Sequence, residues 1–290
     1  MDIIFDMETQ DPDDMFALCF LGSHPAVKLR AVTVTPGSKA QVGIVRHLLD
    51  RLELPQVPIG AGNPDLEKIA VSGFHYKFLG SIAPDSPDAI ADRLLADILA
   101  AYPEATLITG APLHNPGLLL DRHPSVTIKR WVGQGGFAGD NIVPPAHRLA
   151  KFTGKITCPT FNFGGAPTAA KAMLDSERIL ARDLVSKNVC HGIIYDLELH
   201  RRVEPFRHAT PGLKLLYSGM DFYLKKRPYG KKFHDPLAAC IAVNRDIATF
   251  RPVELYQKNR EWGSRLVEGG NTFITIAGDR ELFFQTLVAC

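Results

Sequence analysis

Cysteine is scarce in this sequence, and the few cysteines present follow no pairing pattern. They are odd in number, widely spaced and without a Cys-x-x-Cys pair: Cys19, Cys158, Cys190, Cys240 and Cys290. This arrangement argues against both a disulfide framework and a zinc-thiolate site. We therefore expect a protein of a reducing compartment.

Long apolar runs and a surplus of charge of either sign are also missing. The sequence has no stretch of about 18 apolar residues that would span a bilayer, and its opening Met1-Asp2-Ile3 places an acid where a signal peptide carries its basic start. Lysine and arginine (33) nearly balance aspartate and glutamate (31), for a net charge of +2. We therefore expect a cytoplasmic protein with no nucleic-acid partner and no membrane partner.

What the sequence does contain is a repeating order of short apolar or β-branched runs and segments with helical spacing. This alternation predicts an α/β fold with an open, mainly parallel sheet and helices on both faces. No linker or internal repeat divides residues 1–290, so a single domain is expected. The predicted strands are 3–5, 29–35, 57–60, 106–109, 128–132, 155–158, 252–255 and 272–276, and the predicted helices are 15–21, 39–52, 88–101, 113–120, 168–174, 213–224 and 236–243.

Four loops follow the predicted strands. They are the acidic run from Asp6 to Asp14, Pro36-Gly37-Ser38, Thr109-Gly110-Ala111-Pro112 and Gly133-Gln134-Gly135-Gly136. Ligands of open parallel sheets bind beyond the carboxyl ends of the strands, where such loops converge. We expect the functional site at this edge of the sheet.

The acidic run is the strongest local signal, with five acids in nine positions: Asp6-Met7-Glu8-Thr9-Gln10-Asp11-Pro12-Asp13-Asp14. Neighbouring carboxylates raise each other's pKa, and a hard divalent cation removes that penalty. Oxygen ligands without nearby cysteine favour calcium or magnesium over zinc. For Asp13 and Asp14 alone, the ordinary preference of acids for a helix N-terminus remains an alternative.

A second motif, Phe233-His234-Asp235-Pro236, opens an apolar helical segment. Capping by Asp235 and the first-turn preference of proline would explain these two residues structurally. Neither requires His234, although a lone histidine is more often structural than catalytic.

Together, the two motifs resemble the inosine-uridine-preferring nucleoside hydrolase family, which joins an Asp-rich N-terminal strand end to a late His-Asp-Pro. Thr109-Gly110-Ala111-Pro112-Leu113-His114-Asn115 is similar to the family's Gly-Pro-Leu-Thr-Asn turn, and the loop 133–136 resembles its Met-Gly-Gly loop. Asn141 and Asn162 fall where the family has sugar-contacting asparagines. The resemblance covers about residues 3 to 245 and implies the Rossmann-like nucleoside hydrolase fold.

Carried over residue by residue, the resemblance implies a calcium site. Glu8, Asp14 and Asp235 would bind Ca²⁺ with a backbone carbonyl near Gly110, and Asp6 would be a support or an extra ligand. The ion would orient the ribose hydroxyls and activate a water, with Glu8 receiving its proton.

The resemblance also implies the contacts of a small-molecule nucleoside substrate. Asp13 and Asn162 would hold ribose hydroxyls, and His234 would protonate the departing base. His75 falls in a loop that resembles the family's substrate-covering segment, so contact with the base is expected there. Ser38, Gln134 and Asn141 complete the expected substrate-binding set. A homo-oligomer is expected on the same basis.

Three departures separate this chain from the family pattern. Glu8 replaces an aspartate in a loop that is one residue longer and contains an extra acid, Asp11; Ser38 replaces a sugar-contacting asparagine; and Thr160 replaces an acid that contacts the 5′-hydroxyl. Five cations at 225–227 and 231–232 precede His234. They suit a solvated helix end, or they neutralise a phosphate, so a modified or 5′-phosphorylated nucleoside stays open as substrate.

Two alternatives of other kinds remain. Asp6-Met7-Glu8-Thr9 loosely imitates the Asp-x-Asp-x-Thr start of haloacid dehalogenase-like phosphatases, although that hypothesis leaves the His-Asp-Pro motif unexplained. A catalytically idle relative that only binds a nucleoside or sugar would also account for the altered loop, Ser38 and Thr160.

Overall fold

The backbone forms one large sheet, seen in a computed structural model that describes residues 1–290. Its strand order is β4-β3-β2-β1-β5-β6-β8-β13-β11-β12-β7. Neighbouring strands from β4 to β13 run parallel, and the pairs made by β11 with β13, β11 with β12, and β12 with β7 are antiparallel. The strands are β1 (Asp2–Met7), β2 (Lys28–Val34), β3 (Ile59–Ala61), β4 (Ala89–Ile90), β5 (Thr106–Thr109), β6 (Arg130–Gln134), β7 (Thr157–Cys158), β8 (Arg182–Val185), β11 (Ala248–Lys258), β12 (Glu261–Leu266) and β13 (Thr272–Gly278).

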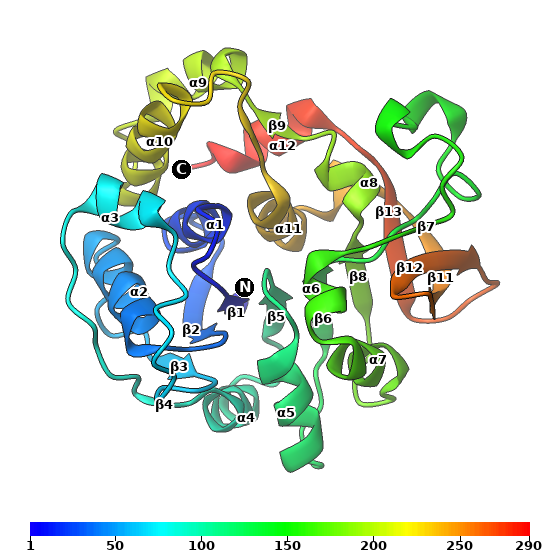
Figure 1. The fold of residues 1–290 in the computed structure, drawn as a ribbon, viewed down its shortest axis with the longest axis horizontal. Helices are drawn as coiled ribbons and strands as arrows, with labels where there is room; N and C mark the ends of the chain where they lie inside the picture. The colour runs from blue at the N-terminus through cyan, green and yellow to red at the C-terminus, as the bar shows by residue number, and fades with distance from the viewer.

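Helices cover both faces of this sheet (Figure 1). Helices α1, α2, α10, α11 and α12 contribute to the larger hydrophobic core, and α4, α5 and α7 contribute to the smaller one. Strand β1 is apolar throughout its middle because Ile3 and Phe5 face the larger core while Ile4 faces the smaller. The helices are α1 (Asp13–Leu21), α2 (Lys39–Arg51), α3 (Gly73–Leu79), α4 (Ala91–Ala101), α5 (His114–Arg122), α6 (Phe161–Gly165), α7 (Pro167–Asp175), α8 (Lys187–Cys190), α9 (Leu197–Val203), α10 (Pro211–Leu224), α11 (His234–Val243) and α12 (Arg280–Leu287).

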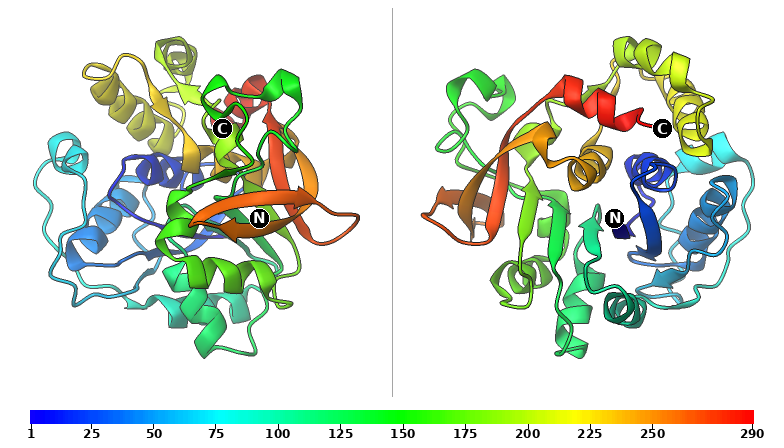
Figure 2. Two further views of the ribbon diagram at one scale, coloured as in Figure 1. Left: turned by 45° about the vertical axis from the view of Figure 1, so that its right-hand side comes forward. Right: turned by 180° about the vertical axis from the view of Figure 1, so that it is seen from behind.

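The predicted α/β class is confirmed, but two strand predictions need correction. The predicted strand 155–158 is not part of the parallel series, because only Thr157–Cys158 is extended and it pairs antiparallel with β12 at the far edge. The parallel strand β8 was missed, because two of its four residues, Arg182 and Asp183, are charged. In Figures 1 and 2 the hairpin β11–β12 (orange) lies on the side of the molecule away from α2.

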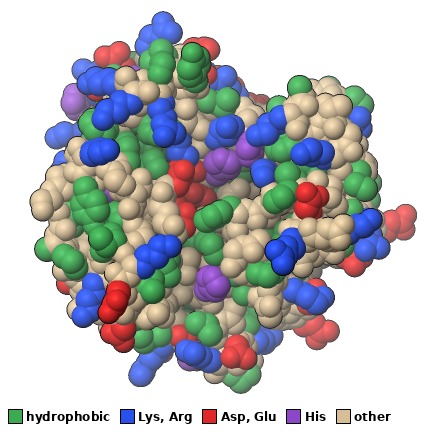
Figure 3. All heavy atoms as spheres, viewed as in Figure 1, with side chains coloured by type: hydrophobic (Ala, Val, Ile, Leu, Met, Phe, Trp, Pro, Cys, Tyr) green, Lys and Arg blue, Asp and Glu red, His purple; other side chains and the backbone are tan.

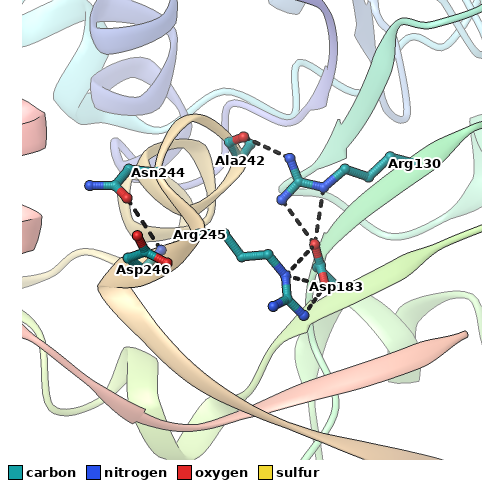
Figure 4. A network of polar contacts seen from close by, with 6 residues as sticks. All are labelled: Arg130, Asp183, Ala242, Asn244, Arg245 and Asp246. Carbon is teal, nitrogen blue, oxygen red and sulfur yellow. Dashed lines mark hydrogen bonds and ion pairs between the residues drawn. The ribbon is translucent and has the colours of Figure 1, made fainter. Parts of the chain in front are cut away.

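The charges of β8 are satisfied within the structure. Asp183 pairs with Arg130 of β6 (Oδ2 to Nη2, 2.9 Å) and with Arg245 just after α11 (Oδ1 to Nη2, 3.1 Å). Arg130 also donates to the carbonyl oxygen of Ala242 at the end of α11 (2.8 Å), as Figure 4 shows. This network fixes the C-terminal end of α11 against the sheet.

The N-terminal end of α11 is approached through a small second sheet. Strands β9 (Ile194–Tyr195) and β10 (Lys231–Lys232) pair antiparallel, and β10 leads directly into α11. Both ends of α11 are therefore held, and its first residues lie at the carboxyl edge of the parallel strands.

No helix of the chain is long and apolar enough to cross a bilayer.

Candidate active site

A cavity of about 280 Å³ lies at this edge, where the loops after β1, β5 and β6 meet the start of α11. Figure 3 shows acidic side chains in a hollow near the middle of one face, with histidine and cationic side chains beside them. The lining residues are Glu8, Asp11, Asp13, Asp14, Gly110, Gln134, Thr160, Phe161, Asn162, Lys187, His191, Lys231, His234 and Asp235. Most of the residues expected from the sequence are thus brought together.

Asp13 connects the N-terminal acidic run to the start of α11. It begins α1, and its Oδ2 accepts hydrogen bonds from the backbone N–H groups of His234 (2.8 Å) and Asp235 (3.0 Å). Asp13 therefore supplies the carboxylate that caps α11, and the capping role considered for Asp235 is wrong, since no side chain of its own segment caps that helix. Asp235 is left free to face the cavity.

Asp14 and Asp235 converge on Gly110. A Cβ atom at Gly110 would lie 2.8 Å from Asp14 Oδ1 and 2.9 Å from Asp235 Oδ1, so only glycine fits here. Burial, together with the charge of Asp235, raises the pKa of Asp14 well above its ordinary value, and burial with the charge of Asp13 does the same for Asp235. Asp235 Oδ1 is buried without a hydrogen-bond partner. The pair is therefore costly to ionise without a cation.

Glu8 follows β1 and borders the same space. Its backbone N–H donates to Asp14 Oδ1 (3.1 Å), and its carboxylate accepts from Gln10 Nε2 (3.2 Å). Burial and then the charge of Asp11 raise the pKa of Glu8 to about 7. A carboxylate with this pKa is suited to exchange a proton near neutral pH.

Asp6 lies behind these residues and does not line the cavity. Its Oδ1 accepts from Thr33 Oγ1 (2.6 Å) and Asn115 Nδ2 (2.8 Å), while Oδ2 is buried without a partner. Burial raises its pKa to about 7 against the effect of these two donors. No three acidic, histidine or cysteine side chains lie close enough together to form a ready group of metal ligands. Glu8, Asp14 and Asp235 are nevertheless buried carboxylates, and such oxygen ligands suit a hard cation.

Polar groups of β6 and α6 form the next part of the lining. Asn162 Nδ2 donates to the carbonyl oxygen of Gly110 (2.9 Å) and to Oε1 of Gln134 (2.7 Å). These bonds hold the two amides and the glycine loop in one arrangement.

His234 and His191 lie beside each other, with ring centroids 5.0 Å apart and ring planes at 83°. Burial lowers the pKa of His234, and burial together with His234 and Lys151 lowers that of His191 to about 3. Sequence reasoning missed His191 and Lys187, because both follow the unpredicted strand β8. A prediction of that strand would have placed Lys187 at the carboxyl edge.

Three expected substrate-binding residues lie outside this cavity. Ser38 caps α2 and its Oγ donates to the carbonyl oxygen of Ile69 (2.8 Å), and Asn141 Nδ2 donates to the carbonyl oxygen of Ser264 (2.9 Å). His75 lies in α3 rather than in a loop and is fully buried. Burial lowers its pKa to about 4. The first two use these hydrogen bonds to hold the fold.

A second cavity of about 390 Å³ adjoins the first through Asp11. Helices α3 and α10 provide its aromatic wall with Phe74, Phe222 and Tyr223, and Lys226 and Arg227 also line it. The cations before α11 are thus divided between the two cavities. Lys231 borders the first cavity and pairs with Asp11 (2.9 Å).

Comparison with known proteins supports one family. The sequence profile described as inosine-uridine preferring nucleoside hydrolase matches residues 3–285. An uncharacterized protein of Aquifex aeolicus is 31% identical over 97% of this chain and 96% of its own length. The pyrimidine-specific ribonucleoside hydrolase RihA of Salmonella paratyphi A is 25% identical over 82% of this chain and 78% of its own.

A solved structure agrees in fold. The purine-preferring ribonucleoside hydrolase from Gardnerella vaginalis has a TM-score of 0.73 and 18% identity, with 100% of this chain and 98% of that chain covered. Nucleoside hydrolases in general depend on a metal ion. The chain belongs to the inosine-uridine preferring nucleoside hydrolase family and is an N-glycosyl hydrolase.

Proposed function

We propose that this enzyme is a calcium-dependent N-ribosyl hydrolase that cleaves the N-glycosidic bond of a nucleoside to give the free base and the ribose. One observation carries the proposal: Glu8, Asp13, Asp14 and Asp235 meet at one cavity at the carboxyl edge of the sheet, with Lys231 their only ion-paired cation. Such an excess of buried negative charge suits both a divalent cation and a sugar that becomes positive during the reaction.

The cation would be held by Glu8, Asp14 and Asp235 with the carbonyl oxygen of Gly110, and Asp6 would support Asp14 from behind. Calcium bound there supplies the charge that orients the ribose hydroxyls and makes a nearby water more acidic. The buried, unpartnered Asp235 Oδ1 and the carboxylate and carbonyl oxygens of the proposed ligands support an oxygen-preferring ion.

Glu8 would take the proton of the attacking water. The pKa of this carboxylate, raised to about 7 by burial and Asp11, makes it an effective base near neutral pH. Water attacks the anomeric carbon as the bond to the base breaks, and the surrounding carboxylates stabilise the positive charge on the sugar.

The remaining lining residues would hold the sugar and the base. Asp13 Oδ1 carries no hydrogen bond beside its ion pair with Lys231, and the bonds of Asn162 use only its amide nitrogen. The Asp13 carboxylate and the side-chain oxygen of Asn162 are therefore available to the ribose hydroxyls. The aromatic wall of the second cavity suits a planar base, because a base ring stacks well on aromatic side chains. His234 would protonate the departing base. Because burial lowers its pKa, only a fraction of His234 carries the proton at neutral pH.

We also propose a cytoplasmic location and a homo-oligomeric assembly. Four of the five free cysteines are buried and none is paired, which suits the reducing cytoplasm. A homo-oligomer is proposed from family membership alone.

A nucleoside panel with calcium, and again after chelation, tests the proposal, with free base detected by chromatography. We expect base release that requires calcium and falls on the order of 10³-fold in Glu8→Gln. If every nucleoside stays intact while a ribose-like ligand still raises the melting temperature, the chain is the idle binder considered above. The phosphatase alternative is replaced by the family match over residues 3–285.

His234→Ala separates the role of leaving-group protonation. The variant should lose on the order of 10²-fold with natural nucleosides and little with an activated aryl riboside, whose leaving group needs no proton. Equal losses on both substrates would remove His234 as the acid.

A further inference from the structure

Beside the acidic residues, the cavity carries positive groups that no carboxylate neutralises. Lys187 and His191 line it, Lys151 Nζ lies 2.6 Å from His191 Nδ1, and Lys232 is close enough to lower the pKa of His191. We call Lys151, Lys187, His191 and Lys232 the cationic group. Its three lysines form no ion pair with an acidic side chain, and the Lys187 ammonium donates only to the carbonyl oxygen of Pro159 (2.6 Å).

The other four cations preceding α11 already have partners within the fold. Lys225 pairs with Asp221 (2.8 Å) and the buried Lys231 with Asp11 (2.9 Å). Lys226 lies over the ring of Phe222 and Arg227 over that of Tyr223. The unneutralised charge is therefore contributed by Lys232 of β10 together with Lys151 in the loop before β7 and Lys187 of α8.

The three lysines of the cationic group repel one another, and His191, whose pKa is about 3, is a neutral ring that accepts from the Lys151 ammonium. Burial followed by Lys232 and Lys187 lowers the pKa of Lys151, and the same neighbours contribute to the low pKa of His191. An anion between them would remove this penalty, since each ammonium would gain a charge-assisted hydrogen bond.

Thr160 adds an uncharged donor to the same wall. It lines the cavity and is 5% exposed, and its hydroxyl Oγ1 is buried without a hydrogen-bond partner. Its neighbour Pro159 accepts from Lys187, so the hydroxyl and the ammonium belong to one corner of the cavity. A phosphate oxygen would satisfy both groups.

We propose that this corner binds a phosphomonoester on the 5′ carbon of the ribose, so that the substrate is a nucleoside 5′-monophosphate. The inference rests on the proposed hydrolase function and deepens it. The acidic residues would hold the sugar hydroxyls, and the cationic group would hold the dianion. Lys187, His191 and Thr160 line the same cavity of about 280 Å³ as Asp13 and Asp14.

The reaction leaves the phosphate ester intact. The C1′–N bond breaks and a C1′–O bond to water forms, giving ribose 5-phosphate and the free base. The proton of the water goes to Glu8, and the base receives a proton from His234.

The test compares the calcium-loaded full chain on matched pairs, each nucleoside against its 5′-monophosphate, for adenine, hypoxanthine, uracil and cytosine bases. We expect kcat/KM to be roughly 10- to 100-fold higher for the monophosphate of the preferred base, with ribose 5-phosphate as product. Lys187→Gln and Lys151→Gln should each reduce that ratio roughly 10-fold. Lys129→Gln is the matched control, because Lys129 pairs with Glu104 outside the cavity, and it should leave the ratio unchanged.

Failure of the inference and failure of the proposed function give different results. If nucleosides are cleaved as well as or better than their monophosphates, the inference is overturned and the hydrolase function stands. If no substrate releases base, calorimetry with ribose 5-phosphate and ribose decides. Binding of ribose 5-phosphate at least 10-fold tighter than ribose, lost in Lys187→Gln, supports the phosphate site, and equal binding of the two sugars overturns it.

Discussion

The two ends of α11 each hold a buried carboxylate, and the two carboxylates have opposite surroundings. At the C-terminal end, Asp183 lies between Arg130 and Arg245, both pointing at it in Figure 4. At the N-terminal end, Asp235 lies among Asp13, Asp14 and Glu8 and is raised in pKa by burial and then by Asp13.

Asp183 has a structural role, whereas the carboxylates at the N-terminal end of α11 lack sufficient positive charge within the fold and are suited to bind a ligand. Asp183 is compensated by two guanidinium groups, so its charge is neutralised within the fold, and removing one partner would leave a charge unpaired. The acidic residues at the other end are compensated by Lys231 alone, and their burial opposes stability until a cation binds. Unfavourable charge is thus concentrated where the substrate would lie.

Among substitutions at the two ends of α11, Asp14→Asn is expected to have the largest effect. Base release should fall on the order of 10⁴-fold, because one ligand of the proposed calcium site is lost, which is roughly 5 kcal/mol of activation free energy. The calcium-free variant should nevertheless be more stable than wild type by about 1 kcal/mol or more, because a buried charge is removed. Kinetics and urea denaturation measure the two effects, and a destabilised, fully active variant would contradict both.

The pH dependence of the free energy of unfolding tests the acidic residues at the N-terminal end of α11. Burial raises the pKa of Asp6 and of Glu8 to about 7, so the folded chain binds these protons more tightly than the unfolded chain. Their stabilising contribution is complete below about pH 4 and is lost as pH rises through about 7, and for Asp6 it is on the order of 4 kcal/mol. Urea denaturation of calcium-free protein should show this decline between about pH 6.5 and 8, because below that range the lowered pKa values of His75 and His191 give the opposite trend.

Added calcium should reverse the decline at the upper end of that range, because it stabilises the ionised carboxylates. A calcium-free stability that does not decline between about pH 6.5 and 8 would show that the acidic residues are already neutralised within the fold.

At the opposite end of α11, Asp183→Ala should lower the free energy of unfolding by about 3 kcal/mol, because it leaves Arg130 buried without its partner. Activity of the folded, calcium-loaded variant should stay within a few-fold of wild type. Asp246→Ala is the matched control, since Asp246 is exposed at the same helix end and should change stability by under about 0.5 kcal/mol. A collapse of activity in folded Asp183→Ala would mean that the two ends are coupled.

The smallest effect is expected from Arg245→Lys. The lysine keeps the charge but loses the fork that reaches Asp183, while Arg130 stays in place, so the loss should be about 1 kcal/mol. Thermal unfolding measures it. A loss as large as that of Asp183→Ala would show that Arg245 alone compensates the carboxylate.

Local pattern predicted the regular half of the fold and the acidic half of the site. Strands such as β1 are apolar runs because both faces are covered, and the acidic run follows β1 directly, so its position at the carboxyl edge was predictable. Strand β8 was not, since its charged residues are satisfied only by partners distant in sequence, Arg130 and Arg245.

The cationic part of the cavity was beyond the sequence for the same reason. Of the cations before α11, only Lys232 belongs to the cationic group, and Lys151 and Lys187 come from two other segments. The cap of α11 is a second example, because the capping carboxylate of Asp13 precedes the helix by more than two hundred residues. Long-range pairing of this kind leaves no local signature.

That cap has a consequence for synthesis on the ribosome. The hydrogen bond from the Asp235 N–H to Asp13 spans 222 positions of the chain. At roughly 5–20 residues per second, Asp13 leaves the ribosome on the order of ten to forty seconds before its partner is made. The nascent chain therefore carries Glu8, Asp13 and Asp14 without Asp235 through most of translation, and we expect the ion to load only after the last quarter of the polypeptide has been released.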